Sequence, residues 1–190
     1  MLPRETKLIG IAGPSGSGKT VLARALAREY GGLHIESDLF YKRRPTGFFK
    51  GYSNWEHPDC IMWNELFKRI SDLKAGKTTL VPSVECSEIF DWPLHPKFPI
   101  LLDGFLLFFD ERICGLCDER FFLDADPEIQ IARRVSREGL GVAGMCKDLV
   151  VPHYSLYHDL VASRATFILD GNKKPEEVFS LARNYLERKK

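Results

Sequence analysis

A phosphate-binding loop near the amino terminus constrains the fold of this chain more than any other feature. The pattern G-x-x-x-x-G-K-[ST] occupies residues 13–20. An apolar run at 8–12 predicts a buried strand before the loop, and strong helix formers at 21–28 predict a helix after it. This order of strand, loop and helix is the context in which the motif holds nucleotide phosphates. We therefore expect the chain to bind a nucleoside triphosphate.

Each kind of residue in the loop has its own mechanical role. Glycines let the backbone curl, so that successive N–H groups face one concavity at the start of a helix. Lys19 is expected to reach the β- and γ-phosphates, and the Thr20 hydroxyl is expected to bind Mg²⁺. The nucleotide-binding residues predicted in the loop are Gly13, Ser15, Gly16, Ser17, Gly18, Lys19 and Thr20.

Length and composition indicate one ordinary globular domain. The 190 residues suit a single P-loop domain with room for a lid. A net charge of +1 offers no electrostatic case for binding nucleic acid or an anionic membrane. The chain has no apolar run near the roughly 18 residues of a transmembrane helix, and its five cysteines suit reduced thiols. We expect a cytoplasmic enzyme without a signal peptide, and its oligomeric state, monomer or homo-oligomer, stays open.

Helix and strand patterns alternate along the chain, which is typical of βα units on a parallel sheet. An amphipathic helix is predicted at 58–75, and an irregular stretch with several prolines is predicted at 78–99. Further apolar runs predict strands at 34–36, 99–102, 121–123 and 166–169. Together with the first strand, they predict an α/β fold of the P-loop NTPase type, with a parallel sheet of about five strands flanked by helices.

Three carboxylates fall where a parallel sheet places functional residues. Asp38 follows the second predicted strand, Asp103 ends the strand at 99–102, and Glu56 lies in a long loop at 39–56. Ligands bind beyond the carboxyl ends of the strands in such sheets. Asp103 stands where a second phosphate-binding motif would hold Mg²⁺ directly or through water. Each acid taken alone is equally typical of a helix cap.

Three arginines follow on a later predicted helix. Arg133, Arg134 and Arg137 precede the segment 139–144, which has three glycines in six residues. Phosphoryl transfer needs positioning and neutralisation of charge on the transferring group. A lid at about 134–150 that closes over the phosphates would supply that charge and exclude water. We expect at least one of the three arginines only to solvate the helix surface.

These segments resemble the uridine kinase and nicotinamide riboside kinase group of P-loop nucleoside kinases. S-D-L-F-Y-K at 37–42 resembles the D-x-F-Y-K segment of the group. N-W-E-H-P-D at 54–59 resembles the N-F-D-H-P-D of uridine kinases, and D-G-F-L-L-F at 103–108 is similar to the E-G-F-L-L-F of nicotinamide riboside kinases. The resemblance covers almost the whole chain and implies a P-loop kinase.

The later part of the chain continues the resemblance. A-R-R-V-S-R at 132–137 resembles the lid helix of the group, and V-P-H-Y-S-L-Y at 151–157 resembles the segment after the lid in riboside kinases. L-D-G-N-K at 169–173 corresponds to the loop that contacts adenine in these enzymes. The resemblance implies ATP as phosphate donor and Mg²⁺ as cofactor.

The resemblance also implies a role for each matching residue. Asp38 would accept the proton of a ribosyl 5′-hydroxyl, and Glu56 would bind the ribose hydroxyls. Asp103 and Thr20 would hold Mg²⁺. The full catalytic prediction is Asp38, Lys19, Arg134 and Arg137. The nucleotide-binding prediction adds Arg133 and Asn172 to the loop residues. The predicted substrate-binding residues are Asp38, Tyr41, Trp55 and Glu56.

The chain departs from the group where the acceptor would bind. Glu56 is one methylene longer, and Asp103 one shorter, than the matching acids. Uridine kinases read the pyrimidine with P-x-Y-D-x-x-x-H, whereas P-S-V-E-C-S-E-I at 82–89 lacks that tyrosine and histidine. A site without the hydrogen-bond partners of a polar base discriminates that base from other acceptors less well, by several orders of magnitude. Trp55 could instead stack on nicotinamide, whose cation would gain about 0.5–2 kcal/mol. The alternative to this stacking role is that Trp55 packs in the hydrophobic core.

Several acceptors and two other classes of protein therefore stay open. The first expectation is a kinase of nicotinamide riboside or of a pyrimidine nucleoside such as uridine. A P-loop kinase of another small metabolite, such as pantothenate or a sugar, would share the loop and the lid and differ only in its acceptor pocket. A GTP-binding regulatory module is disfavoured. N-K-K-P at 172–175 resembles the guanine-reading N-K-x-D, but Pro175 stands in place of the aspartate.

Overall fold

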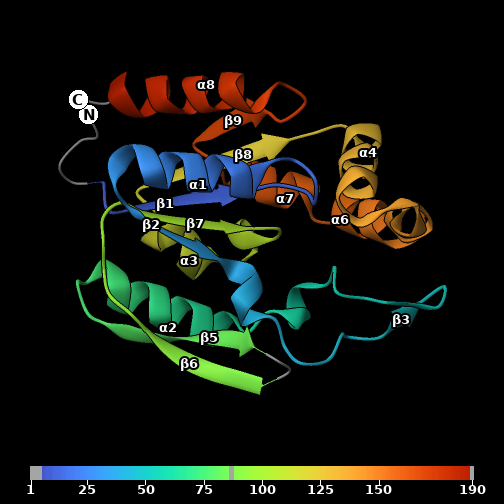
Figure 1. The fold of residues 1–190 in the computed structure, drawn as a ribbon, viewed down its shortest axis with the longest axis horizontal. Coiled ribbons are helices and arrows are strands. Elements are labelled where there is room, and N and C mark those ends of the chain that lie inside the picture. Colours follow the sequence, from blue (N-terminus) through green and yellow to red (C-terminus); the bar gives the residue numbers. More distant parts are fainter. Residues whose placement is uncertain (1–5, 86–87, 189–190) are drawn as a thin grey trace.

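Five parallel strands form the central sheet of the computed structural model, which describes residues 6–85 and 88–188 (Figure 1). The strands are β1 (Leu8–Ala12), β2 (Leu33–Glu36), β7 (Ile100–Gly104), β8 (Glu119–Asp124) and β9 (Phe167–Asp170). Their order in the sheet is β2-β7-β1-β8-β9. The predicted P-loop NTPase-type α/β fold, with about five parallel strands flanked by helices, is confirmed.

The topology opens a crevice between β1 and β7. The P-loop leads from β1 into α1 (Lys19–Tyr30), which packs on one face of the sheet, whereas α3 (Glu111–Leu116), which follows β7, packs on the other. Neighbouring parallel strands whose connections leave to opposite faces bind ligands at their carboxyl ends. Ala12 pairs with Gly104 at those ends. The P-loop and Asp103 therefore flank the same crevice.

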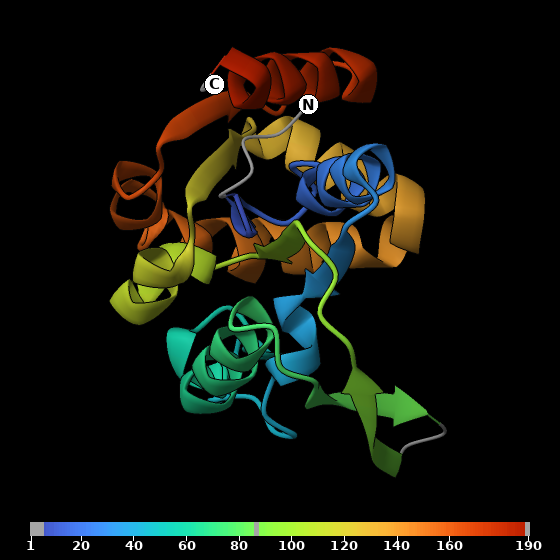
Figure 2. The same cartoon turned by 90° about the vertical axis from the view of Figure 1, so that its left-hand side faces the viewer.

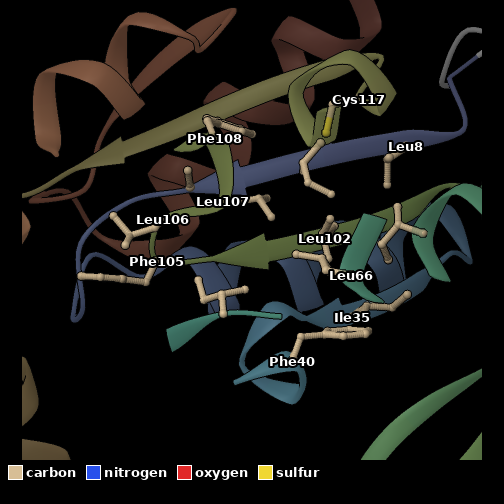
Figure 3. Close-up of a cluster of buried hydrophobic side chains, with 14 of the residues drawn as sticks. Leu8, Ile35, Phe40, Leu66, Leu102, Phe105, Leu106, Leu107, Phe108 and Cys117 are labelled. Carbon is tan, nitrogen blue, oxygen red and sulfur yellow. The ribbon is translucent and has the colours of Figure 1, made fainter. Parts of the chain in front are cut away.

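Two buried hydrophobic clusters cover the two faces of the sheet. Helices α1 and α8 (Pro175–Arg188) cover one face, and α2 (Trp63–Lys74), α3 and α7 (His158–Ser163) belong to the other. Figure 3 shows the second cluster, which includes Leu66 of α2 and Leu102 of β7. Because both faces are covered, the central strands β1 and β7 are buried along their whole length. Among the described residues, no helix has both the length and the apolar character of a membrane span.

An antiparallel hairpin occupies most of 78–99, so the prediction of an irregular stretch there is wrong. β5 (Thr79–Glu85) pairs with β6 (Glu88–Leu94) beside α2, apart from the central sheet (Figures 1 and 2). Pro82 and Pro93 favoured the loop prediction. A two-stranded hairpin has two open edges, where a missing backbone N–H leaves no ladder bond unmade, so it tolerates proline.

The amphipathic helix begins later than predicted. Helix α2 starts at Trp63, and the predicted first turn is instead a short 3₁₀ turn at Pro58–Cys60. Ile61 is extended and forms a bridge with Tyr41. The backbone N–H groups of residues 42 and 62 donate to the carbonyl oxygens of residues 60 and 40, at 2.7 and 2.8 Å. This pairing holds the chain out of the helix and brings 38–42 beside 54–62.

Part of the predicted long loop 39–56 is a small hairpin. β3 (Phe48–Phe49) pairs with β4 (Tyr52–Ser53) across a turn in which Lys50 and Gly51 both have positive φ, 48° and 82°. The sequence signal for this hairpin was a two-residue turn containing glycine, with Phe49 before it and Tyr52 after it.

The predicted lid region is a series of short helical turns. Helix α4 (Pro127–Glu138) ends at Gly139, which has a φ of 90°. After it come 3₁₀, α and π turns as far as Val150, and then α6 (Val151–Ser155), beside the carboxyl ends of the strands (Figure 1). The glycine-rich segment 139–144 therefore forms short helical turns. Its action as a lid stays a prediction.

Candidate active site

The P-loop is packed so closely that two of its glycines leave no space for a side chain. A Cβ at Gly13 would lie 2.4 Å from the carbonyl oxygen of Leu123, and one at Gly16 would lie 2.7 Å from that of Gln130. Gly18, the N-cap of α1, provides no side-chain cap. The first N–H groups of the helix therefore face the concavity without a capping acceptor, which suits an anion.

Thr20 and Asp103 meet at the crevice between β1 and β7. The Thr20 hydroxyl donates to Asp103 Oδ2 at 2.5 Å, and His34 Nε2 lies 2.6 Å from Oδ1 of the same carboxylate. Asp103 is only 2% exposed, so both of its oxygens are satisfied inside the protein. His34 was missed by the sequence analysis, because its closeness to Asp103 depends on β2 lying beside β7.

The donors at this corner fit a magnesium ion bound together with a nucleotide. Within the described residues, no group of three or more His, Cys, Asp or Glu side chains could enclose a metal. Mg²⁺ usually takes one or two carboxylates and completes its shell with phosphates and water. Thr20 donates its proton to Asp103 and keeps oxygen lone pairs for a cation. One hydroxyl and one carboxylate beside a phosphate-binding loop match that preference.

A cavity of about 730 Å³ opens in front of the P-loop. All the residues predicted for catalysis or substrate binding line it, together with Ser15, a second residue of the P-loop besides Lys19. The predicted residues are Lys19, Asp38, Tyr41, Trp55, Glu56, Arg134 and Arg137. The structure thus brings together four segments that are far apart in the sequence. The sequence analysis missed the apolar lining from Phe105, Met145 and Leu149. The position of Phe105 directly after β7 was the available signal.

The two acids of the cavity have raised pKa values. Asp38 reaches the open cavity, but the surrounding protein partly desolvates its carboxyl and raises the pKa, which the charge of Lys19 opposes. Burial raises the pKa of Glu56 to about 7, and the charge of Arg134 opposes that shift. The charge of Asp38 also raises the pKa of Glu56, and the charge of Asp103 raises that of Asp38. The two acids therefore share one electrostatic environment with Lys19.

Two aromatic rings stand together in the wall of the cavity. The ring centroids of Tyr41 and Trp55 are 6.1 Å apart, at 67°, in an edge-to-face arrangement. Burial raises the pKa of the Tyr41 phenol, so its hydroxyl stays neutral around pH 7. The wall therefore offers an apolar surface and one neutral hydroxyl to a ligand.

The three arginines of α4 divide between two sides of the P-loop. Arg134 and Arg137 line the cavity, and both form ion pairs with Glu138. The Arg133 guanidinium turns the other way and donates to the carbonyl oxygens of Gly171 at 2.7 Å and Gly16 at 3.2 Å. Positions three apart share a helix face and adjacent positions do not, which explains the division.

A second cavity, of about 880 Å³, lies on the other side of the P-loop between α1 and α8. Ser17, Gly18 and Arg133 line one end of it, and Val21 and Phe179 contribute apolar surface. Val21 and Phe179 were missed by the sequence analysis.

Asn172 has a structural contact near this second cavity. Its side-chain oxygen accepts from the backbone N–H of Asp126 at 2.9 Å, just before α4. Asn172 therefore links the loop after β9 to the start of the arginine-bearing helix. Its predicted contact with a nucleotide stays a prediction.

The matching family and the curated relatives show the class of protein, a phosphotransferase that acts on a hydroxyl acceptor. Residues 8–141 match the model of the phosphoribulokinase / uridine kinase family. The chain belongs to this family, and the predicted resemblance to uridine kinases is confirmed.

Curated relatives of the chain are uridine kinases. It is 33% identical to the uridine kinase of Brevibacillus brevis over 162 residues, which cover 77% of this chain and 72% of the relative. It is 32% identical to that of Bacillus subtilis over 162 residues, covering 77% and 74%. The uridine kinase of Schizosaccharomyces pombe is 27% identical over 97% of this chain, which spans only 45% of that relative.

Solved structures support the fold. One described as a possible uridine kinase from Bacillus stearothermophilus has a TM-score of 0.63 and 19% identity, covering 90% of this chain and 91% of the other. Shikimate kinase from Acinetobacter baumannii has a TM-score of 0.56 and 16% identity, covering 96% and 92%. Both likenesses concern the fold alone.

Proposed function

We propose that this protein transfers the γ-phosphoryl group of ATP to the 5′-hydroxyl of a ribonucleoside-like substrate, in a Mg²⁺-dependent reaction. The observation that carries the proposal is the shared cavity, where Lys19 of the P-loop stands with the acids Asp38 and Glu56 and the arginines of α4. Phosphoryl transfer needs cations around the transferring group and an acceptor for the hydroxyl proton. The cavity offers both, and the uridine kinases among the relatives support a nucleoside acceptor.

Asp38 orients the attacking hydroxyl and accepts its proton. A carboxylate is a weak base for an alcohol, so the proton moves late, once the oxygen has begun to bond to phosphorus. The raised pKa of Asp38 makes it a better base than an exposed aspartate. Lys19 beside it attracts the phosphate to the same place.

Glu56 binds the ribose 2′- and 3′-hydroxyls in its ionised form, because a carboxylate can accept two hydrogen bonds. Its place in the cavity with Asp38 sets the sugar between the two acids. By binding the ribose, Glu56 fixes the position of the 5′-hydroxyl relative to Asp38. Phosphoryl transfer requires this positioning.

Lys19, Arg134 and Arg137 neutralise the charge of the transferring group. Glu138 holds both arginines at the wall of the cavity. A triphosphate would compete with Glu138 for the same guanidinium groups, since phosphate and carboxylate are both bidentate partners of arginine. Contacts between these arginines and the triphosphate would favour closure of the predicted lid, at about 134–150, over the nucleotide.

Thr20 and Asp103 would hold Mg²⁺ together with the phosphates, a role that the hydrogen bond between them supports. The bound metal supplies neutralisation of phosphate charge. Arg133 and the loop around Asn172 lie at the second cavity or next to it, which we propose for the adenine.

The acceptor base is the open part of the proposal. Trp55 and Tyr41 provide an apolar wall for a flat ring, either the nicotinamide of nicotinamide riboside or the base of a pyrimidine nucleoside such as uridine. Pro82, the first residue of the departing segment 82–89, lines the cavity. Residues 86–87 of that segment lie outside the described residues.

We also propose that residues 1–190 form one domain that works in a reducing, cytoplasmic compartment. The cysteines of the described residues, Cys60, Cys114, Cys117 and Cys146, are free thiols. Burial raises the pKa of Cys117 to about 12, so this thiol is not reactive.

The experiment that tests the proposal is ADP production with Mg·ATP over a panel of acceptors: uridine, cytidine, adenosine, nicotinamide riboside, pantothenate and none. We expect turnover with at least one ribonucleoside. Turnover with pantothenate alone would assign another small-molecule kinase. ADP formed equally without any acceptor would mean a nucleotide hydrolase and would contradict the proposal.

A further inference from the structure

His34 is held against the carboxylate of Asp103 inside the protein. Its Nε2 lies 2.6 Å from Asp103 Oδ1, and the side chains are 15% and 2% exposed. A carboxylate only accepts, so the imidazole donates from Nε2. Neither the phosphate-binding motif nor the proposed mechanism uses this histidine.

Sheet register explains why His34 reaches this carboxylate. In β2 and β7, Glu36 pairs with Asp103, and His34 lies two residues before Glu36. Residues two apart in a strand share a face, so His34 and Asp103 lie diagonally on one face of the sheet. Thr20 reaches the same carboxylate from α1. Three elements thus converge on Asp103, which connects the P-loop helix with two strands.

The two oxygens of Asp103 have separate partners. Oδ2 accepts from Thr20, and Oδ1 accepts from His34. Without His34, Oδ1 would be a buried acceptor lacking its partner, which is costly. The carboxylate would then be free to rotate toward other hydrogen-bond donors. Such a rotation would also move Oδ2, which accepts the hydrogen bond from Thr20. His34 therefore restricts the orientation of Asp103.

We infer that His34 is a positioning residue for the magnesium site. It holds the Asp103 carboxylate in the orientation in which Asp103 and Thr20 act together on the metal. This inference rests on the proposed function, because the metal site belongs to that proposal. Partners that orient a metal-binding carboxylate typically change metal affinity or activity by 10–100-fold when they are removed.

A merely structural role would give a different result. A histidine that only satisfies a buried acceptor would affect unfolding and leave metal binding by the folded protein unchanged. Metal binding to the enzyme–nucleotide complex, measured without any acceptor, separates the two roles. It also keeps the result independent of which nucleoside the enzyme phosphorylates.

The test compares His34→Leu with His34→Gln. Leucine removes the donor, whereas glutamine places an amide N–H at a similar reach. Binding of Mn²⁺, as a paramagnetic substitute for Mg²⁺, to the enzyme–ADP complex is followed by electron paramagnetic resonance. ADP affinity without metal is measured by calorimetry as the control. We expect His34→Leu to weaken Mn²⁺ binding roughly 10–100-fold at unchanged metal-free ADP affinity. His34→Gln should stay within a few-fold of the parent protein.

Two results would overturn the inference. Parental Mn²⁺ affinity in folded His34→Leu protein would show that the histidine does not position the metal site. An equal loss of Mn²⁺ binding in His34→Leu and His34→Gln would show that the N–H donor at position 34 is not what orients the Asp103 carboxylate. Asp103→Asn is the reference variant. If it too binds Mn²⁺ like the parent, the magnesium site of the proposed function is wrong, and the inference falls with it.

Discussion

Thr20 and Asp103, 83 positions apart in the sequence, share a hydrogen bond of 2.5 Å between the hydroxyl and the carboxylate. The bond joins the first turn of α1 to the end of β7 across the crevice at the middle of the sheet. It places a hydroxyl and a carboxylate together beside the P-loop, where a phosphate-bound cation would need both.

The first prediction concerns this pair. Thr20→Ala should lower kcat by at least about 100-fold, because metal stabilisation of a phosphoryl-transfer transition state is worth several kcal/mol. Thr20→Ser keeps the hydroxyl and should retain activity within a few-fold. Steady-state kinetics over a Mg²⁺ titration make the comparison. Equal activity in the alanine and serine variants would remove Thr20 from the metal site.

The strands β1 and β7 were predictable from sequence because each is buried on both faces and gives an apolar run, at 8–12 and 99–102. The hairpin at 79–94 was not, since Pro82 and Pro93 favour a loop when only local sequence is considered. His34 could not be placed at the site, because its contact with Asp103 requires the order of β2 and β7, which local patterns do not contain.

The second prediction concerns pH and acceptor use. Burial raises the pKa of Glu56 to about 7, and the proposed ribose contact needs the ionised carboxylate. The kcat/KM for the acceptor should therefore rise as pH increases through about 7 and then level off. Glu56→Gln should lower kcat/KM and remove this inflection. A parental profile that is flat from pH 6 to 8 would contradict the role of Glu56.

The third prediction concerns stability and the same residue. A folded-state pKa above the unfolded value means that the folded protein binds the proton more tightly. Stability is then lost as pH rises from about 4.5 to about 7. The shift corresponds to up to roughly 3 kcal/mol. Glu56→Gln should remove this loss and melt at a higher temperature than the parent protein at pH 8. Identical melting temperatures at pH 8 would argue against the raised pKa.

The fourth prediction separates two neighbouring arginines. Arg134 lines the cavity, so Arg134→Met should lower kcat by about 10²–10³-fold, the usual loss when a group that stabilises transition-state charge is removed. Arg133 contacts backbone carbonyls of the P-loop and of residue 171, so Arg133→Met should chiefly raise the KM for ATP, by about tenfold. Initial rates at varied ATP distinguish the two. The same change of kcat and KM in both variants would show that Arg133 and Arg134 do not have separate roles in ATP binding and catalysis.

The fifth prediction concerns the proton acceptor. Asp38→Asn should lower kcat by about 10²–10⁴-fold while ATP still binds, because the amide cannot accept the proton. Asp59→Asn is the matched control, since Asp59 lies on the nearby 3₁₀ turn with its side chain 75% exposed. Calorimetry with ATP checks binding in both variants. Near-parental turnover of Asp38→Asn would exclude Asp38 as the acceptor of the proton.

The measurement closest to the central claim is the position of the transferred phosphate. Mg·ATP is incubated with uridine, nicotinamide riboside and 5′-deoxyuridine, and the products are examined by phosphorus NMR. The proposed function predicts a 5′-monophosphate from at least one of the two ribonucleosides and no product from 5′-deoxyuridine. A phosphate on the 2′- or 3′-hydroxyl, or no product from either ribonucleoside, would contradict it.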